Sequence, residues 1–115
     1  MLVKYLKSKI HRAIITDANL DYEGSISIDE ALMEAADLNM YEKVHVLDIT
    51  NGNRVETYII KAKKGSGQIC INGAAAHLIK PHDQVIIISY CSLSEGEVLN
   101  YKPIIIKVNN HNQII

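Results

Sequence analysis

The chain has 115 residues and a formal net charge of −1 at neutral pH. This length predicts a single domain over residues 1–115, and the balanced charge gives no reason to expect nucleic acid or an anionic membrane surface as a partner. No window is apolar for long enough to span a bilayer. The N-terminus lacks the apolar segment of a signal peptide, so we expect a cytoplasmic protein.

The composition favours strands. The sequence has six tyrosines but no phenylalanine or tryptophan, so isoleucine and valine must supply most of the core, and β-branched residues pack well in sheets. A first strand is predicted over residues 10–15, ended by the polar residues 16–19. Residues 22–25 follow as a short extended segment.

One helix is predicted over residues 28–38. Apolar side chains recur there at helical spacing, at Ile28, Ala31, Leu32, Ala35 and Leu38. Ser27 and Glu30 have the spacing of a capping box, in which the serine caps the helix and the glutamate reaches back to the cap. The helix is therefore expected to start after Ser27.

A β-hairpin is the next predicted unit. Residues 44–49 and 54–62 are both rich in β-formers, and Asn51-Gly52 lies between them. This dipeptide between two such runs is a strong hairpin signal. Gly65-Ser66-Gly67 is then expected to be a loop, and it lacks the spacing of a phosphate-binding loop.

The last third of the chain is predicted to hold three more short elements and a tail. Residues 68–71 read as a short strand, and residues 74–78 as a helical turn after the turn at Asn72-Gly73. The apolar run 85–90 is typical of a strand buried on both faces. Residues 104–108 form the last expected strand, and the polar residues 109–112 are expected to fray. Many short strands with one or two short helices predict a mainly β fold, a small β-barrel.

The cysteines and histidines do not form a metal site or a redox motif in the sequence. Cys70 and Cys91 lie in or beside apolar runs and are not in a CxxC motif, so buried free thiols are expected. The five histidines show no metal-ligand spacing such as HxxxH, so no metal is predicted.

The Gly24-Ser25 pair has a chemical possibility beyond its usual role in turns. A serine hydroxyl can attack the carbonyl of the preceding glycine, which has no Cβ to hinder the approach. The amide becomes an ester, β-elimination cuts the chain after Gly24 and leaves dehydroalanine at position 25, and hydrolysis of that group makes a pyruvoyl N-terminus. Such a group is an electron sink. Taken alone, a Gly-Ser pair is more typical of a turn.

The residues around this pair supply the context. The sequence contains, in order, the segments Lys9-Ile10-His11-Arg12, Thr16, Ala18, Leu20, Tyr22, Gly24-Ser25, Thr50-Asn51-Gly52, Arg54, Thr57-Tyr58, Gly65-Ser66-Gly67 and Asn72-Gly73-Ala74-Ala75-Ala76. With this set in this order, the chain closely resembles the bacterial aspartate 1-decarboxylase family, pyruvoyl enzymes that make β-alanine for pantothenate. The resemblance runs from about residue 1 to about residue 90.

The resemblance implies a fold, an assembly and a reaction. The fold would be a six-stranded double-psi β-barrel, and four subunits would form active sites at their interfaces. The chain would cut itself between Gly24 and Ser25. The covalent pyruvoyl group from Ser25 would form a Schiff base with L-aspartate, and the products would be β-alanine and CO₂.

Tyr58 and Thr57 are the next candidates. The carbanion left by decarboxylation must regain a proton, and a phenol nearby can act as general acid; the resemblance implies that Tyr58 is this donor. It also assigns Thr57 to substrate binding and to positioning the Gly24 carbonyl for cleavage. Adjacent residues of a regular strand point to opposite faces, so both can act only if the strand twists, bulges or serves two neighbouring sites.

Substrate binding is expected from cations and from a segment of small residues. The planar fork of Arg54 suits a carboxylate, and Lys9 can supply a second positive charge. The segment Asn72-Gly73-Ala74-Ala75 exposes backbone amides that can lie against substrate, and the resemblance assigns it this role. His11 and Tyr22 are expected beside the site rather than in contact with substrate.

The sequence departs from the family pattern at one turn. His82 precedes Asp83 where the family usually has glycine, so a positive φ at this position would carry a cost, although histidine tolerates it better than most residues.

Two other functions remain open from the sequence alone. The chain could be an uncleaved small barrel that serves as a binding module, or a pyruvoyl decarboxylase for another amino acid such as glutamate.

Overall fold

The computed structural model describes residues 1–115 as one continuous chain. Eight strands form a single sheet in the order β2-β6-β3-β5-β4-β7-β1-β8. The strands are β1 (Val3–Ile14), β2 (Asp17–Asn19), β3 (Ser25–Asp29), β4 (Lys43–Asp48), β5 (Arg54–Ala62), β6 (Ile69–Asn72), β7 (Gln84–Leu93) and β8 (Ile104–Lys107). The helices are α1 (Glu30–Ala35), α2 (Glu95–Val98) and the 3₁₀-helix η1 (Gly73–His77). The predicted mainly β fold is confirmed, and the curved sheet is consistent with a small β-barrel, with eight strands in place of six and three short helices in place of one or two.

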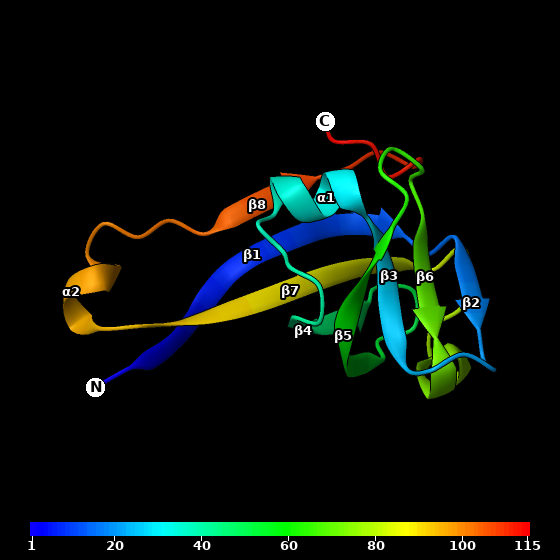
Figure 1. Ribbon diagram of the computed structural model, residues 1–115, viewed down its shortest axis with the longest axis horizontal. Helices are drawn as coiled ribbons and strands as arrows, with labels where there is room; N and C mark the ends of the chain where they lie inside the picture. Colours follow the sequence, from blue (N-terminus) through cyan, green and yellow to red (C-terminus); the bar gives the residue numbers. More distant parts are fainter.

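Two long antiparallel strands, β1 and β7, run through the molecule (Figure 1). β1 starts seven residues before its predicted start at residue 10, because its first half pairs with the end of β7. The register shifts twice along this pair, and Arg12 at the second shift has φ of 64°. β7 alternates between buried and half-buried residues from Gln84 to Ser89, so the prediction of a strand buried on both faces is wrong.

The segment after β1 differs most from its prediction. Residues 17–19, expected to end the first strand, form the separate strand β2, which pairs in parallel with β6. An extended segment was expected at residues 22–25, but β3 begins only at Ser25. Ile28 belongs to β3, and the helix starts at Glu30 with Asp29 as its N-cap, so the Ser27 capping box is wrong.

Asp29 explains why the helix starts later. Its Oδ1 accepts hydrogen bonds from the backbone N–H of Ala31 and of Gly65, and its Oδ2 accepts one from Gly67. Asp29 is 3% exposed. The same carboxylate therefore caps α1 and holds the predicted glycine loop, two tasks that a hydroxyl could not perform together.

The predicted hairpin is confirmed. β4 and β5 pair antiparallel without a register shift, from Lys43–Tyr58 to Leu47–Arg54. Gly52 has φ of 82° in the turn, a conformation that glycine adopts without steric cost. Asp48 accepts hydrogen bonds from the backbone N–H groups of Thr50 and Asn51.

The turn before β7 confirms the expected strain at His82. His82 has φ of 75°, and its N–H donates to the carbonyl of Ile15. A left-handed residue with a Cβ costs about 1 kcal/mol or more, and the turn keeps this conformation because it joins the end of β1 to the start of β7.

The C-terminal part contains one missed helix and an anchored tail. α2 has a true capping box, formed by Ser94 and Glu97, and it lies at the far end of the β1–β7 pair in Figure 1. The tail does not fray as predicted. Asn112 is 3% exposed and bonds to the backbone of Ile14 and Gly67.

The core lies on one face of the curved sheet and under α1. It is built mainly from isoleucine and valine, as expected, and its fully buried large side chains are Ile10, Ile15, Ile26, Ile28, Leu32, Ile59, Ile69, Ile71, Ile79, Ile87, Val44 and Val46. Both cysteines are free thiols, with Cys70 buried and Cys91 half-buried. None of the helices has the length and apolar character needed to cross a membrane.

Candidate active site

The Gly24-Ser25 peptide lies where an exposed loop enters the sheet. Gly24 is exposed, while Ser25, the first residue of β3, is 1% exposed. The Ser25 Oγ donates a long hydrogen bond of 3.3 Å to the carbonyl of Glu23. The Ser25 hydroxyl is thus buried, while Gly24, on the other side of the peptide bond, is exposed to solvent.

Asn72 holds the Ser25 hydroxyl from the neighbouring strand. Ser25 pairs directly with Asn72 across β3 and β6, and the Asn72 Nδ2 donates to the Ser25 Oγ at 2.9 Å and to the Ser27 Oγ at 3.1 Å. The Cys70 thiol donates to the Asn72 Oδ1 at 3.2 Å, which orients the amide. Burial, and then the charge of Asp17, raise the pKa of the Cys70 thiol, so it stays protonated as a donor.

The sequence pointed to Asn72 only as part of a substrate-binding segment, and Ser27 and Cys70 were not predicted. Ser27 follows Ser25 by two residues and Cys70 precedes Asn72 by two, so each pair shares a face of its strand. That alternation would have pointed to both residues if the 25–29 segment had been read as a strand.

Gly73 packs against the Gly24 backbone. Gly73 has φ of 79°, and a Cβ placed on it would lie 2.7 Å from the Gly24 Cα and 2.8 Å from the Gly24 nitrogen. Any larger residue would push the Gly24-Ser25 peptide out of place. Of the other small residues predicted here, Ala74 is exposed and Ala75 packs partly on the core.

Tyr58 lies across from the start of β3 by register. The parallel pairing of β3 with β5 starts at Ile26–Ile59, so one step back along both strands matches Ser25 with Tyr58. Thr57 precedes Tyr58 and points to the opposite face of β5. Gly24 lies outside β3, and no hydrogen bond joins Thr57 to it.

The predicted cations lie elsewhere on the same face of the sheet as Tyr58. We call this the outer face, the side of β5, β4, β7 and β1 away from the core. It comprises Arg54, Glu56, Tyr58, Leu47, His45, Lys43, Ile86, Ile88, Tyr90 and Lys9, none of them fully buried. Strand geometry places Arg54 about 13 Å along β5 from Tyr58, and Lys9 is on β1, four strands from β3.

His11 and Tyr22 occupy different surroundings. His11 pairs with Lys107 of β8, and burial together with the charges of Arg12, Lys9 and Lys107 lowers its pKa. Tyr22 is 53% exposed in the loop before Gly24. Its carbonyl oxygen would lie 3.1 Å from a Cβ at position 73, so its backbone belongs to the Gly24–Gly73 contact.

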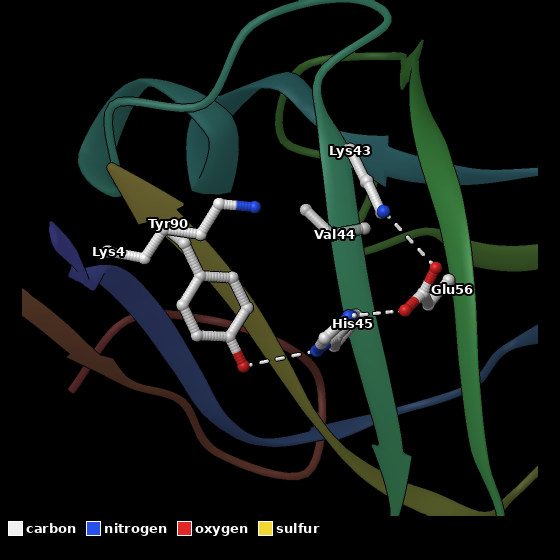
Figure 2. A pocket seen from close by; sticks show the side chains of 6 residues that line it. All are labelled: Lys4, Lys43, Val44, His45, Glu56 and Tyr90. Atoms are coloured by element: carbon white, nitrogen blue, oxygen red, sulfur yellow. Dashed lines mark hydrogen bonds and ion pairs between the residues drawn. The ribbon is translucent and has the colours of Figure 1, made fainter. Parts of the chain in front are cut away.

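A hollow of about 500 Å³ opens on the outer face (Figure 2). Its lining is Lys4, Lys43, Val44, His45, Glu56 and Tyr90. Figure 2 shows the Glu56 carboxylate between the Lys43 ammonium and the His45 ring, with Tyr90 on the other side of the ring. Sequence reasoning did not single out these residues. No group of three or more His, Cys, Asp or Glu side chains could hold a metal ion.

Comparison with known proteins gives matches over the whole chain. A sequence model of a family described as aspartate decarboxylase matches residues 1–115. The aspartate 1-decarboxylase of Caldicellulosiruptor bescii is 55% identical over 115 residues, all of this chain and 90% of that protein. The aspartate 1-decarboxylase of Acetivibrio thermocellus is 56% identical, covering all of this chain and 91% of that protein.

The match also extends past residue 90, beyond the motifs recognised in the sequence. The aspartate 1-decarboxylase of Pelotomaculum thermopropionicum is 55% identical over 115 residues and covers all of this chain and 87% of that protein. With a family match over its full length and several relatives above half identity, this chain belongs to the aspartate decarboxylase family.

Proposed function

We propose that this chain is the precursor of a pyruvoyl-dependent aspartate 1-decarboxylase, which converts L-aspartate to β-alanine and CO₂. Family membership supports the reaction. The observation that carries the self-processing is the buried Ser25 hydroxyl, held by Asn72 next to a Gly24 backbone packed on Gly73.

The cleavage uses only atoms of the chain and water. The Ser25 Oγ attacks the Gly24 carbonyl carbon through a five-membered ring, its proton passes to the leaving nitrogen, and an ester replaces the amide. Loss of the residue 25 Cα proton and of the Cβ–O bond releases the Gly24 carboxylate and leaves dehydroalanine. Water then hydrolyses the dehydroalanine: its nitrogen leaves as ammonia, an oxygen takes its place, and a pyruvoyl group remains.

Asn72, Gly73 and Thr57 have separate tasks in this step. The Asn72 amide donates to the Ser25 Oγ, so it orients the hydroxyl, and this oxygen later leaves with the Gly24 carboxylate. Gly73 leaves room for the Gly24 backbone. Thr57 is on β5, the strand that pairs with β3, and is proposed to hold the Gly24 carbonyl.

The residues around position 25 fit a small pyruvoyl group, since the Asn72 amide lies beside the side chain of residue 25 and Gly73 leaves room for the neighbouring Gly24 backbone. When formed, this group accepts the electrons left on the substrate as CO₂ departs. Tyr58, on the same side of the sheet, is proposed to donate the proton that the substrate carbon then needs. Arg54 and Lys9 are proposed to bind the substrate carboxylates, and residues 72–75 to contact substrate through their backbone.

We propose that the active site is shared between copies in a homotetramer. Arg54 and Tyr58 are separated by about 13 Å along β5, which exceeds the length of an aspartate. Glu56 lies between them on the same strand. Lys9 is farther still across the sheet. A second copy facing the outer face would bring its own Arg54 and Lys9 to Ser25. We place the reaction in the cytoplasm, where its product would feed pantothenate biosynthesis.

Intact mass spectrometry tests the proposal directly. The purified chain should separate into residues 1–24 and a fragment that begins with pyruvoyl at position 25. Ser25→Ala removes the attacking oxygen and should leave the chain intact and without decarboxylase activity. A wild-type chain that stays whole would support the uncleaved binding module instead, and cleavage of the Ser25→Ala chain would contradict the acyl shift.

The substrate is tested separately. CO₂ release measured with L-aspartate and with L-glutamate should favour aspartate by at least about tenfold in kcat/KM, since one methylene in a fitted pocket discriminates by about that much. Equal rates would point to the broader amino-acid decarboxylase that the sequence left open.

A further inference from the structure

We propose that Lys43 and His45 hold the Glu56 carboxylate away from Arg54, so that the Arg54 guanidinium stays free for the substrate carboxylate. This inference rests on the proposed function, in which Arg54 binds aspartate. Lys43, His45 and Glu56 are positioning residues in this scheme and do not contact the substrate.

Arg54 and Glu56 are natural partners for an ion pair. They are two residues apart on β5, so their side chains leave the same face about 7 Å from each other. Both line a hollow of about 160 Å³ together with His45 and Val55. Directly opposite Arg54 lies Leu47, which offers no competing charge. Nevertheless, the Arg54 side chain makes no hydrogen bond and no ion pair, while the side chain of Arg12, the other arginine, donates to Gln84.

Glu56 is instead engaged through both of its oxygens. Its Oε1 accepts a hydrogen bond from the His45 Nε2 at 3.0 Å, and its Oε2 pairs with the Lys43 Nζ at 3.2 Å. Both partners stand on β4, on the side of β5 opposite to β3 (Figure 2). The hydrogen bonds from Lys43 and then from His45 lower the pKa of Glu56, so the carboxylate is charged at neutral pH and would otherwise attract a guanidinium.

Tyr90 completes the arrangement. The Tyr90 hydroxyl lies 3.1 Å from the His45 Nδ1. If the phenol donates to Nδ1, the neutral ring carries its proton on Nε2, the nitrogen that faces Glu56. His45 can therefore hold Glu56 without being protonated, and the ring is fixed at both nitrogens. The three residues form a chain from β7 to β4 to β5 across the outer face.

The consequence concerns affinity. A free Glu56 carboxylate would compete with the substrate carboxylate for the Arg54 guanidinium, which can form a paired set of hydrogen bonds with either. Lys43 also offsets the negative charge that an anionic substrate meets on approach. Loss of this clamp should therefore weaken substrate binding while the chemistry at residue 25 proceeds as before.

Kinetics of Lys43→Gln provide the first test. Exposed ion pairs are weak, so we expect KM for aspartate to rise by about two- to fivefold with kcat and self-cleavage unchanged. Glu56→Gln added to Lys43→Gln should restore KM, because the competing charge is gone. Lys61→Gln is the matched control: it removes another exposed lysine–glutamate pair of β5, to Glu30 at 3.1 Å, far from Arg54.

Side-chain NMR provides a readout that does not depend on activity. The chain has two arginines, so the Nε–Hε signals of Arg12 and Arg54 can be assigned by substituting one of them. In Lys43→Gln the Arg54 signal should shift and its exchange with water should slow, while the Arg12 signal stays in place. Adding Glu56→Gln should return the Arg54 signal to its wild-type position.

The outcomes separate this inference from the proposed function. The proposed role of Lys43 and His45 is wrong if the Arg54 signal and KM are both unchanged in Lys43→Gln. It is also wrong if adding Glu56→Gln fails to restore KM. Arg54→Gln is the independent check of the underlying role: if it leaves KM unchanged, Arg54 does not bind substrate and the proposed assignment fails. A large effect of Arg54→Gln with no effect of Lys43→Gln would reject the clamp alone.

Discussion

The serine hydroxyl at position 25 is held by a directed hydrogen bond from Asn72, whose own orientation is set by the Cys70 thiol. A buried amide left without one partner costs about 1–3 kcal/mol, so the chain of three side chains favours one arrangement of the hydroxyl. Tyr58 is on the same side of the sheet but belongs to another strand. The residues that would make the pyruvoyl group and the residue that would use it are therefore separable by mutation.

Tyr58→Phe tests this separation. Phenylalanine keeps the ring, including its tilted contact with Tyr41 at 6.3 Å between centroids, and removes only the phenol. We expect normal cleavage after Gly24 and turnover lower by about a hundredfold or more, because a positioned general acid typically contributes about 10²–10⁴-fold. Mass spectrometry and CO₂ release measure the two halves. Near-normal turnover would exclude Tyr58 as the proton donor, and an uncleaved chain would give it a role in maturation.

Asp48, at the end of β4, and Asp83, directly before β7, form a buried pair of carboxylates. Asp48 is 2% exposed and Asp83 is 9% exposed, and the Asp48 Oδ2 has no hydrogen-bond partner. Burial, and then the neighbouring Asp83, raise the pKa of Asp48 to about 6. A proton on the Asp48 Oδ2 could be donated to Asp83, which would relieve both the repulsion and the missing hydrogen bond.

This pair of carboxylates contributes to the free energy of unfolding in a way that depends on pH. The folded pKa of Asp48 lies above its ordinary value of 3.8, so the folded state binds the proton more tightly and this site loses stability as pH rises from about 4 to about 6. Asp48→Asn removes this titration. The free energy of unfolding of the variant, relative to wild type, should therefore be about 1–3 kcal/mol higher at pH 7.5 than at pH 4.5. Urea unfolding at the two pH values measures this difference.

Asp37→Asn is the matched control for that measurement. Asp37 is exposed and has φ of 54°, a left-handed conformation that asparagine also tolerates. Its substitution should change stability equally at both pH values. If Asp48→Asn behaves in the same way as this control, the pKa of Asp48 is not raised in the folded protein.

On the scale of the whole molecule, the proposed site residues are spread across several strands of the sheet. Ser25 and Asn72 lie on one half, while Arg54 and Lys9 lie toward other strands. Several large apolar residues on the surface are also at least 40% exposed, among them Ile49, Ile105 and Tyr90. An arrangement of this kind favours assembly with a second copy over a site closed within one chain.

Mixing two inactive variants tests the shared site. Arg54→Ala and Ser25→Ala chains, co-expressed, should regain activity, because a hybrid can combine the intact residue 25 of one chain with the intact Arg54 of another. Each variant alone should stay inactive or strongly impaired. Light scattering should report four chains per particle. A fully active monomer, or hybrids without activity although they assemble, would contradict the proposed assembly.

Much of the fold could be predicted from local signals. The Asn51-Gly52 turn determined the β4–β5 hairpin, and the β-branched composition indicated the mainly β class with a core of isoleucine and valine. The motif around Gly24 and Ser25 likewise pointed to one family. These predictions succeeded because turn conformation, side-chain volume and the reactivity of neighbouring residues are properties of short segments.

The tertiary structure decided what depends on partners distant in the chain. Ile28 has helical spacing with the residues after it, yet it forms strand β3, because pairing with both β5 and β6 outweighs a weak local preference. Asp29 replaced Ser27 as the helix cap because the loop at Gly65 and Gly67 needs the same carboxylate. Asn112 anchors a tail whose polar sequence predicted fraying, through hydrogen bonds to Ile14 and Gly67.

The same division holds for the site. The sequence by itself determined which residues can perform chemistry, since a Gly-Ser bond, a phenol and a guanidinium each have intrinsic reactivity. Only the tertiary structure placed Asn72 against Ser25, Gly73 against Gly24, and Glu56 between Lys43 and His45. Sheet register decides these contacts, because one step along a strand moves a side chain to the opposite face.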